Sequence, residues 1–372
     1  MRSSADRVRA TQLGACVGLL LLGSGLGGSA LAATGGATEA YPPFGLLETS
    51  GMAVSGLHDG VVWVVEDSGE PPDDLPVVRA FDPSGAEVGS VTLAGWNNRD
   101  TEALSMGPGP TLWVADIGDN LAVRGSVVVH TFEEPAELGA TTLEPVSYRL
   151  RYPDGPRDAE SLMIDPVDGR LYVVTKSGVG GGSLYAAPAR LGPDATHDLT
   201  LVGRVRSFVT DGSFTPDGRQ VLLRAVSGLS KAQTVAVVLD VVRGEDGSVT
   251  RLVETGQVAL PDQEQGESLT VTTDGQTILV GSEGTDEPVW AVPLVTAAQP
   301  SATPSGSSGP VTATAAGPSR PDQAVPDPDA CRLADPTSCL DEPTWWLAAL
   351  GVGLAAMLVA ALAVLRRSAA TR

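Results

Sequence analysis

Residues 99–107 of this 372-residue chain read Arg-Asp-Thr-Glu-Ala-Leu-Ser-Met-Gly, and Leu-Trp-Val-Ala-Asp follows at residues 112–116 after a short turn. The pattern returns at residues 157–165 as Arg-Asp-Ala-Glu-Ser-Leu-Met-Ile-Asp, with Leu-Tyr-Val-Val-Thr at residues 171–175. Valine, tryptophan and tyrosine favour the pleated surface of a sheet, and the segment between the two halves favours a tight turn. Each copy therefore predicts a short hairpin of two strands.

Three further copies of this hairpin lie before and after the two clear ones. They begin at Gly51, at Asp211, where the match is weaker, and at Gln265. In each of them an Asp-Gly pair, which favours a hairpin turn, separates the two halves. One residue of the second strand marks the equivalent position in every copy: Trp63, Trp113, Tyr172, Leu223 and Leu279. The unit thus recurs roughly every 50 to 60 residues, a period typical of repeat architectures.

Further strands follow each hairpin. Third apolar segments lie at residues 77–81, 127–132, 184–187, 235–241 and 289–292, and residues 146–150 add a fourth. Up to four strands in a unit of about 50 residues predict a β-propeller blade, and no long amphipathic helix interrupts them. We therefore expect an all-β protein with a β-propeller at residues 41–297. The five copies favour five blades, but the long gaps after Trp113 and Leu223 leave room for a sixth.

Three short sequences carry a family resemblance: DTEAL at residues 100–104, VADIGDN at 114–120 and DAESL at 158–162. They resemble secreted bacterial propellers of the "esterase-like activity of phytase" family. That family is similar in turn to six-bladed, calcium-dependent propellers such as the gluconolactonases and paraoxonases. The resemblance covers the first three copies of the repeat best. It implies six blades and a calcium ion in the central channel, while many members of the family have no established activity.

The same region predicts a metal site from its residues alone. Glu102, Glu160 and Glu267 stand at equivalent points of three copies, and the innermost strands of a propeller converge on its channel. Carboxylates brought together repel one another unless a cation balances them, and Ca²⁺ takes about six to eight oxygen ligands. The predicted ligands are Glu102, Glu160, Glu267, Asp116, Asp119 and Asn120. The alternative is that each of these carboxylates accepts hydrogen bonds from backbone N–H groups in the loop of a neighbouring blade.

No sequence motif identifies a catalytic residue. The chain lacks the Gly-x-Ser-x-Gly of serine hydrolases and the His-Glu-x-x-His of zinc proteases, and His58, His130 and His197 are far apart. Without a recognisable acid and base, we expect a recognition or ligand-binding module for an unknown extracellular ligand or protein. The alternative is a calcium-dependent hydrolase of esters, phosphoesters or lactones with the metal in the channel.

The N-terminal segment has the three parts of a secretory signal peptide. Arg2, Arg7 and Arg9 precede an apolar run at residues 13–31, which ends in the small residues of Ala-Leu-Ala at 30–32. This order predicts a signal peptide at residues 1–32, cleaved after Ala32. We therefore expect the propeller to be extracytoplasmic.

The C-terminal segment predicts a membrane anchor. Residues 298–344 are rich in Ala, Pro, Ser and Thr and predict a disordered stalk. Residues 345–365 carry no charge and would span about 31 Å as a helix, which matches a bilayer core. The arginines at the start of residues 366–372 favour the cytoplasmic side. These features predict a single-pass type I protein of the cell membrane, with one transmembrane helix.

Charge and cysteine content limit the partners further. The formal net charge of −21 repels phosphate backbones, which excludes nucleic acid binding. After signal cleavage the remaining cysteines are Cys331 and Cys339, and an oxidising compartment favours a disulfide between them. Two free thiols, or pairing between two chains, are the alternatives. We expect a monomer.

Overall fold

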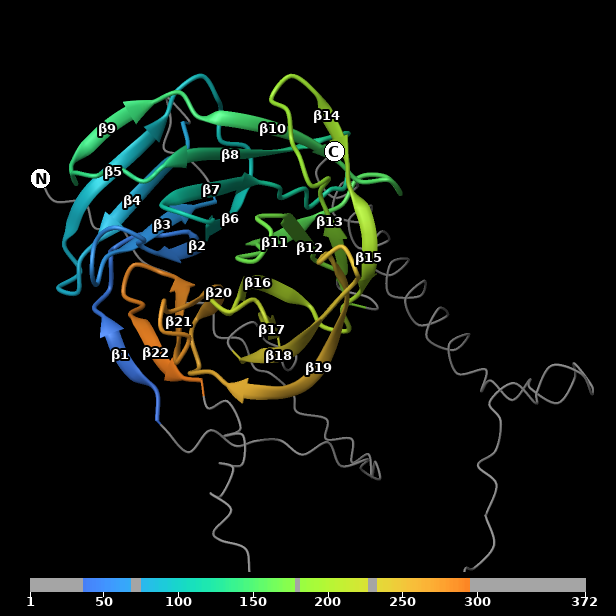
Figure 1. Cartoon of the computed structure of the whole chain (residues 1–372). Coiled ribbons are helices and arrows are strands. Elements are labelled where there is room, and N and C mark those ends of the chain that lie inside the picture. Colours follow the sequence, from blue (N-terminus) through green and yellow to red (C-terminus); the bar gives the residue numbers. More distant parts are fainter. Residues whose placement is uncertain (1–35, 68–74, 178–180, 227–232, 295–372) are drawn as a thin grey trace, which may run out of the picture. The chain divides into compact units, whose positions relative to one another are not determined.

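Twenty-two strands and no helix make up the residues that the computed structural model describes, 36–67, 75–177, 181–226 and 233–294. The strands form five separate sheets arranged around one axis, as the blades of a propeller (Figure 1). The prediction of an all-β propeller is therefore confirmed. The blade count is five, so the sixth blade implied by the family resemblance is wrong for this chain, and the loops after Trp113 and Leu223 contain no additional sheet among the described residues.

One strand from each sheet lines the centre of the ring. These innermost strands are β2 (Thr49–Val54), β6 (Thr101–Met106), β11 (Ala159–Ile164), β16 (Val209–Phe214) and β20 (Gln265–Val271). Each of them contacts the innermost strands of both neighbouring sheets, so the five close a ring. We number the blades 1 to 5 in the order of these strands.

The predicted hairpins and third strands lie where the sequence placed them. The second strands are β3 (Val62–Glu66), β7 (Thr111–Asp116), β12 (Leu171–Thr175), β17 (Gln220–Val226) and β21 (Thr277–Glu283). The third strands are β4 (Val77–Phe81), β8 (Val127–Glu133), β13 (Ser183–Ala186), β18 (Thr234–Arg243) and β22 (Val289–Pro293). Every innermost hairpin turns on a glycine with φ between 66° and 73°, a conformation that other residues adopt with strain: Gly60, Gly109, Gly169, Gly218 and Gly275.

Outer strands complete the blades, and three of the blades also take up a strand from another part of the chain. The outer strands are β5 (Glu87–Leu93), β10 (Val146–Arg151), β15 (Thr200–Arg204) and β19 (Val249–Ala259). Blade 1 gains β9 (Ala140–Leu143), which is parallel to β5, and blade 2 gains β14 (Thr196–Asp198), which is parallel to β10. In both cases the added strand is contributed by the next blade: β9 follows β8 of blade 2, and β14 follows β13 of blade 3. The N-terminal strand β1 (Thr38–Tyr41) pairs antiparallel with β22, so blade 5 is built from both ends of the domain.

The pairing register corrects one equivalence drawn from the sequence. Tyr172 lies opposite Met163, three residues after the β-bulge at Glu160. In blade 4 the residue opposite the third position after the bulge is Leu222, whereas Leu223 lies opposite Gly212. In blade 4 the residue equivalent to Tyr172 is therefore Leu222, one position before Leu223.

The core lies between neighbouring sheets. In the cluster between blades 1 and 2, for example, Trp63 and Val78 pack with Leu112 and Val114, and all four side chains are buried. Because strands of both blades supply these side chains, burial of apolar surface holds each blade to the next.

The predicted signal peptide, stalk, disulfide, transmembrane helix and cytoplasmic tail lie outside the described residues and stay predictions. Within the described ranges, no helix is long and apolar enough to cross a membrane.

Candidate functional site

A β-bulge near the start of each innermost strand defines one end of the channel. The bulged residues are Ser50, Glu102, Glu160, Thr210 and Glu267. The register thus confirms that the three glutamates occupy equivalent positions. They are buried, with exposed fractions of 7, 2 and 3%. A bulge re-aims a side chain relative to the regular strand, so the same irregularity in five strands brings polar side chains to one place.

Glu102 shares a hydrogen bond with Asp100, the residue two positions before it. Burial, together with the charges of Asp100, Glu267 and Asp67, raises the pKa of Glu102 to about 9, although Lys176 acts to lower it. Burial and the charge of Asp158 likewise raise the pKa of Asp100. At neutral pH the Glu102 carboxyl group is therefore protonated, and its O–H donates the hydrogen bond to Asp100. The sequence drew attention to Glu102 but not to its partner.

The other two glutamates meet basic side chains. Lys176, directly after β12, forms an ion pair with Glu160. The buried guanidinium of Arg224 lies in the field of Glu267 and Asp211, which opposes the lowering of its pKa to about 10 by burial. Asp211 accepts hydrogen bonds of 2.7 Å from Gly212 N and Leu269 N, the second in the next blade. No motif marked Lys176, Arg224 or Asp211 in the sequence, because the other copies of the repeat do not share these residues.

Two of the predicted calcium ligands on the loop after β7 are held by Arg124. Asp116 Oδ1 lies 2.7 Å from Arg124 Nη1, and both side chains are buried. The Asp119 carboxylate accepts hydrogen bonds from Val123 N at 2.9 Å and Arg124 N at 2.7 Å. Asn120, the third, is exposed. Asp119 thus accepts from backbone N–H groups of its own loop, not from the loop of a neighbouring blade.

The described residues do not fit a calcium ion as they stand. Among them, no group of three or more His, Cys, Asp or Glu side chains is placed to hold a metal. Glu160 and Asp116 already face cations of the protein, and Asp119 faces backbone amides. The six-residue calcium site stays a prediction. The function proposed below instead depends on the protonation of the buried carboxyl groups.

A polar pocket of about 170 Å³ opens beside this cluster. Asp119, Asp158 and Lys176 line it together with Arg157 and Arg204. Its rim includes Ala122, which has φ of 49° and is the one non-glycine residue with positive φ in the described part of the chain.

The loop at this rim combines backbone strain with exposed apolar side chains. Leu121 and Val123, on either side of Ala122, have exposed fractions of 82 and 69%. Strained backbone of this kind persists only where the surrounding contacts hold it, and such strain is concentrated at binding and catalytic sites. Here the Asp119 and Arg124 contacts hold the loop in place.

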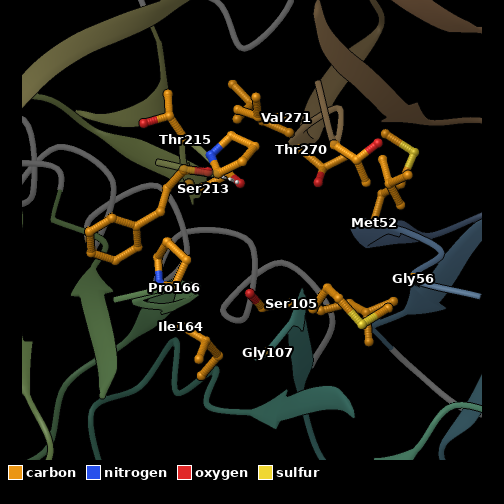
Figure 2. A pocket seen from close by; sticks show the side chains of 18 residues that line it. Met52, Gly56, Ser105, Gly107, Ile164, Pro166, Ser213, Thr215, Thr270 and Val271 are labelled. Atoms are coloured by element: carbon orange, nitrogen blue, oxygen red, sulfur yellow. Dashed lines mark hydrogen bonds between the residues drawn. The ribbon is translucent and has the colours of Figure 1, made fainter. Parts of the chain in front are cut away.

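The opposite end of the channel has different chemistry. A cavity of about 300 Å³ is lined by residues of all five innermost strands, near the hairpin turns (Figure 2). Met52, Met106, Ile164 and Phe214 supply apolar surface, and none of the described residues that line it carries a charge. One end of the channel is thus acidic and the other neutral.

The three histidines lie away from the acidic end. His58 Nε2 lies 2.8 Å from the Pro135 carbonyl oxygen, and His197 Nε2 lies 2.9 Å from the Gly192 carbonyl oxygen. His130 packs against Trp96 and its Nδ1 lies 2.8 Å from Ser147 Oγ. Burial lowers the pKa of His130 to about 4, so its ring is neutral at physiological pH.

No protein-family model and no curated protein sequence matches the chain. Among solved structures, the chain is similar to "Structure of U3-55K", with 15% identity, a TM-score of 0.34 and coverage of 66% of this chain and 68% of that one. It is also similar to XC5397 from Xanthomonas campestris, described as a gluconolactonase, with 16% identity, a TM-score of 0.35 and coverage of 69% and 89%. Neither likeness is close enough to transfer an activity to this chain.

Proposed function

We propose that the protein is a recognition propeller that binds its ligand at the acidic end of the channel, and that the ligand presents a positive charge there. The observation that carries this proposal is the buried carboxyl pair of Glu102 and Asp100, which lies among other carboxyl groups. Burial and neighbouring carboxylates hold a proton that a cation could replace.

The charge balance of the cluster supports a cationic ligand. Carboxyl groups that act on one another electrostatically outnumber the basic groups among them, eight to three. The acidic members are Asp67, Asp100, Glu102, Asp116, Asp158, Glu160, Asp211 and Glu267, and the basic members are Arg124, Lys176 and Arg224. A bound cation would allow Glu102 to ionise, so binding should release a proton.

The polar pocket provides access to this charge. Asp158 and Lys176 belong to both the pocket and the cluster, and the exposed Leu121 and Val123 offer apolar contact at the rim. We further propose that the propeller is displayed outside the cell, anchored by residues 345–365, as the signal peptide and the apolar C-terminal segment indicate.

Calorimetric titration of the full chain with spermidine, an organic cation, tests the proposal. Run at pH 7.5 in two buffers of different ionisation enthalpy, the titrations should show binding with release of up to about one proton. Glu102→Gln, which keeps the shape and removes the ionisable group, should abolish the proton release. The control is Glu137→Gln, at an exposed carboxylate that is not a member of the cluster. Absence of spermidine binding would reject the proposal.

A second candidate function is ester hydrolysis, favoured by the same carboxyl pair. A protonated Glu102 beside a carboxylate at Asp100 provides a proton donor and an acceptor in contact, the arrangement required for general acid and base catalysis. Hydrolysis of p-nitrophenyl acetate or of a simple lactone by the wild type, lost in both Asp100→Asn and Glu102→Gln, would support it. An inactive wild type would leave recognition as the function.

A further inference from the structure

We infer that the neutral end of the channel is a second binding site, which takes a small uncharged molecule with an apolar body and one hydrogen-bonding group. This site is separate from the acidic end, and no charged residue of the cluster lines it. The inference therefore stands or falls independently of the function proposed above.

The cavity belongs to the rigid centre of the fold. Each of the five innermost strands contributes to its wall, for example Met52 from β2, Met106 from β6, Ile164 from β11, Phe214 from β16 and Val271 from β20. Figure 2 shows labelled side chains from these strands around the open space. Because the same strands close the ring, the cavity is formed before any ligand arrives, and little ordering is required for binding.

Size and charge together define the class of ligand. A cavity of about 150 Å³ lined by apolar side chains holds benzene, and ligand pockets begin at about 300 Å³. With about 300 Å³, this cavity has room for a substituted aromatic ring or a short branched chain. An ion would lose its hydration without gaining a charged partner among the described residues, which disfavours charged ligands.

Hydroxyl groups give the cavity its polar contacts. Ser105 and Thr270 line it from β6 and β20, the strands on either side of β2, and neither side chain hydrogen-bonds within the described part of the chain. Thr273 also lines the cavity, from the turn after β20, whereas Ser213 donates to the Phe214 carbonyl oxygen and Thr215 to Asp217 Oδ1. Ser105 and Thr270 therefore have donors and acceptors to offer an alcohol or an amide.

Methionine methyl groups give a direct readout. The chain has five methionines, and two of them, Met52 and Met106, line the cavity. Met163 is fully buried in the packing between blades 3 and 4 and provides an internal control. In the full chain labelled with ¹³C-methyl methionine, benzyl alcohol should shift the Met52 and Met106 signals saturably and leave Met163 unchanged. Benzoate, its charged analogue, should shift neither.

Variants separate hydrogen bonding from apolar contact. Thr270→Val removes the hydroxyl and keeps the shape, so it should weaken benzyl alcohol binding about three- to tenfold while leaving toluene binding unchanged. Ser105→Ala should act in the same direction, whereas the control Thr250→Val, on exposed β19, should have no effect. Absence of saturable shifts at Met52 and Met106 overturns the inference. Equal shifts at Met163, or equal binding of benzoate, also overturn it.

Discussion

Trp63 Nε1 donates a 2.7 Å hydrogen bond to Glu134 Oε1, across the boundary between blades 1 and 2. The same buried carboxylate accepts hydrogen bonds from Gly56 N at 2.9 Å and Leu57 N at 3.1 Å. The three donors all belong to the hairpin of β2 and β3 in blade 1, whereas Glu134 directly follows β8 of blade 2. Glu134 thus holds the hairpin turn of blade 1 against the end of β8.

Glu134→Gln should destabilise the domain by about 2 kcal/mol, because hydrogen bonds to a charged acceptor are stronger and the new amide NH₂ would face donors. Urea unfolding of the variant and of Glu137→Gln gives the comparison. Because Glu137 is exposed, Glu137→Gln should change the free energy of unfolding by less than about 0.5 kcal/mol. Equal stability of the two variants would show that Glu134 does not join the blades.

The close approach of blades 1 and 2 requires a glycine in β2. A Cβ atom on Gly51 would lie 2.4 Å from Leu104 N, a backbone atom that cannot move aside. We expect Gly51→Ala to cost about 1–3 kcal/mol of stability. Gly256→Ala in β19 is the matched control, since nothing lies within 4 Å of its added Cβ. Thermal melts that rank the two variants equally would contradict this packing.

Glu102 should make stability depend on pH above the acidic range. Its pKa is about 9 in the folded protein against 4.5 for an unperturbed glutamate, so its contribution is full below about 4.5 and is lost as the pH rises to about 9. Glu102→Gln should remove this decline and melt several degrees above the wild type at pH 9, but close to it at pH 5. Parallel curves for variant and wild type would show that Glu102 is ionised in the folded state.

His130 should make the stability of the domain depend on pH in the acidic range, and its contribution should be lost as the pH falls. Its pKa is about 4 in the folded protein against 6.5 for an unperturbed histidine, so its contribution is present above about 6.5 and is lost as the pH falls through 4. In His130→Gln the free energy of unfolding should change less between pH 6.5 and 4, by roughly 2 kcal/mol. Urea unfolding at several pH values measures this, with His58→Gln as the half-buried control.

The predicted location has its own test. If residues 1–32 direct export and residues 345–365 anchor the chain, protease added to intact cells should release a soluble fragment that begins near residue 33 and ends near residue 300. Mass spectrometry of the released fragment gives its ends. Protection of the whole chain until the cells are lysed would reject the exposed topology.

The repeat made most of the fold predictable, because each hairpin combines strand-favouring residues with a turn that requires glycine. Sequence reasoning missed the outer strands β5, β15 and β19, which lie outside the repeated hairpins. It also missed the short strands β1, β9 and β14, which pair with the open edge of another strand. The equivalence of Glu102 and Glu267 was also predictable, since register follows from the pattern. The shared proton with Asp100 was not, because it depends on burial, which a pattern does not reveal.

The pairing of β1 with β22 also sets a constraint on when the ring can form. The first strand to be synthesised has no partner until one of the last has been made, since β1 pairs only with β22. Until then blade 5 is incomplete and the chain carries open strand edges, which other chains can pair with. A chain that stops short of β22 lacks both the third strand of blade 5 and the partner of β1, so blade 5 is completed only when the last strand of the domain is made.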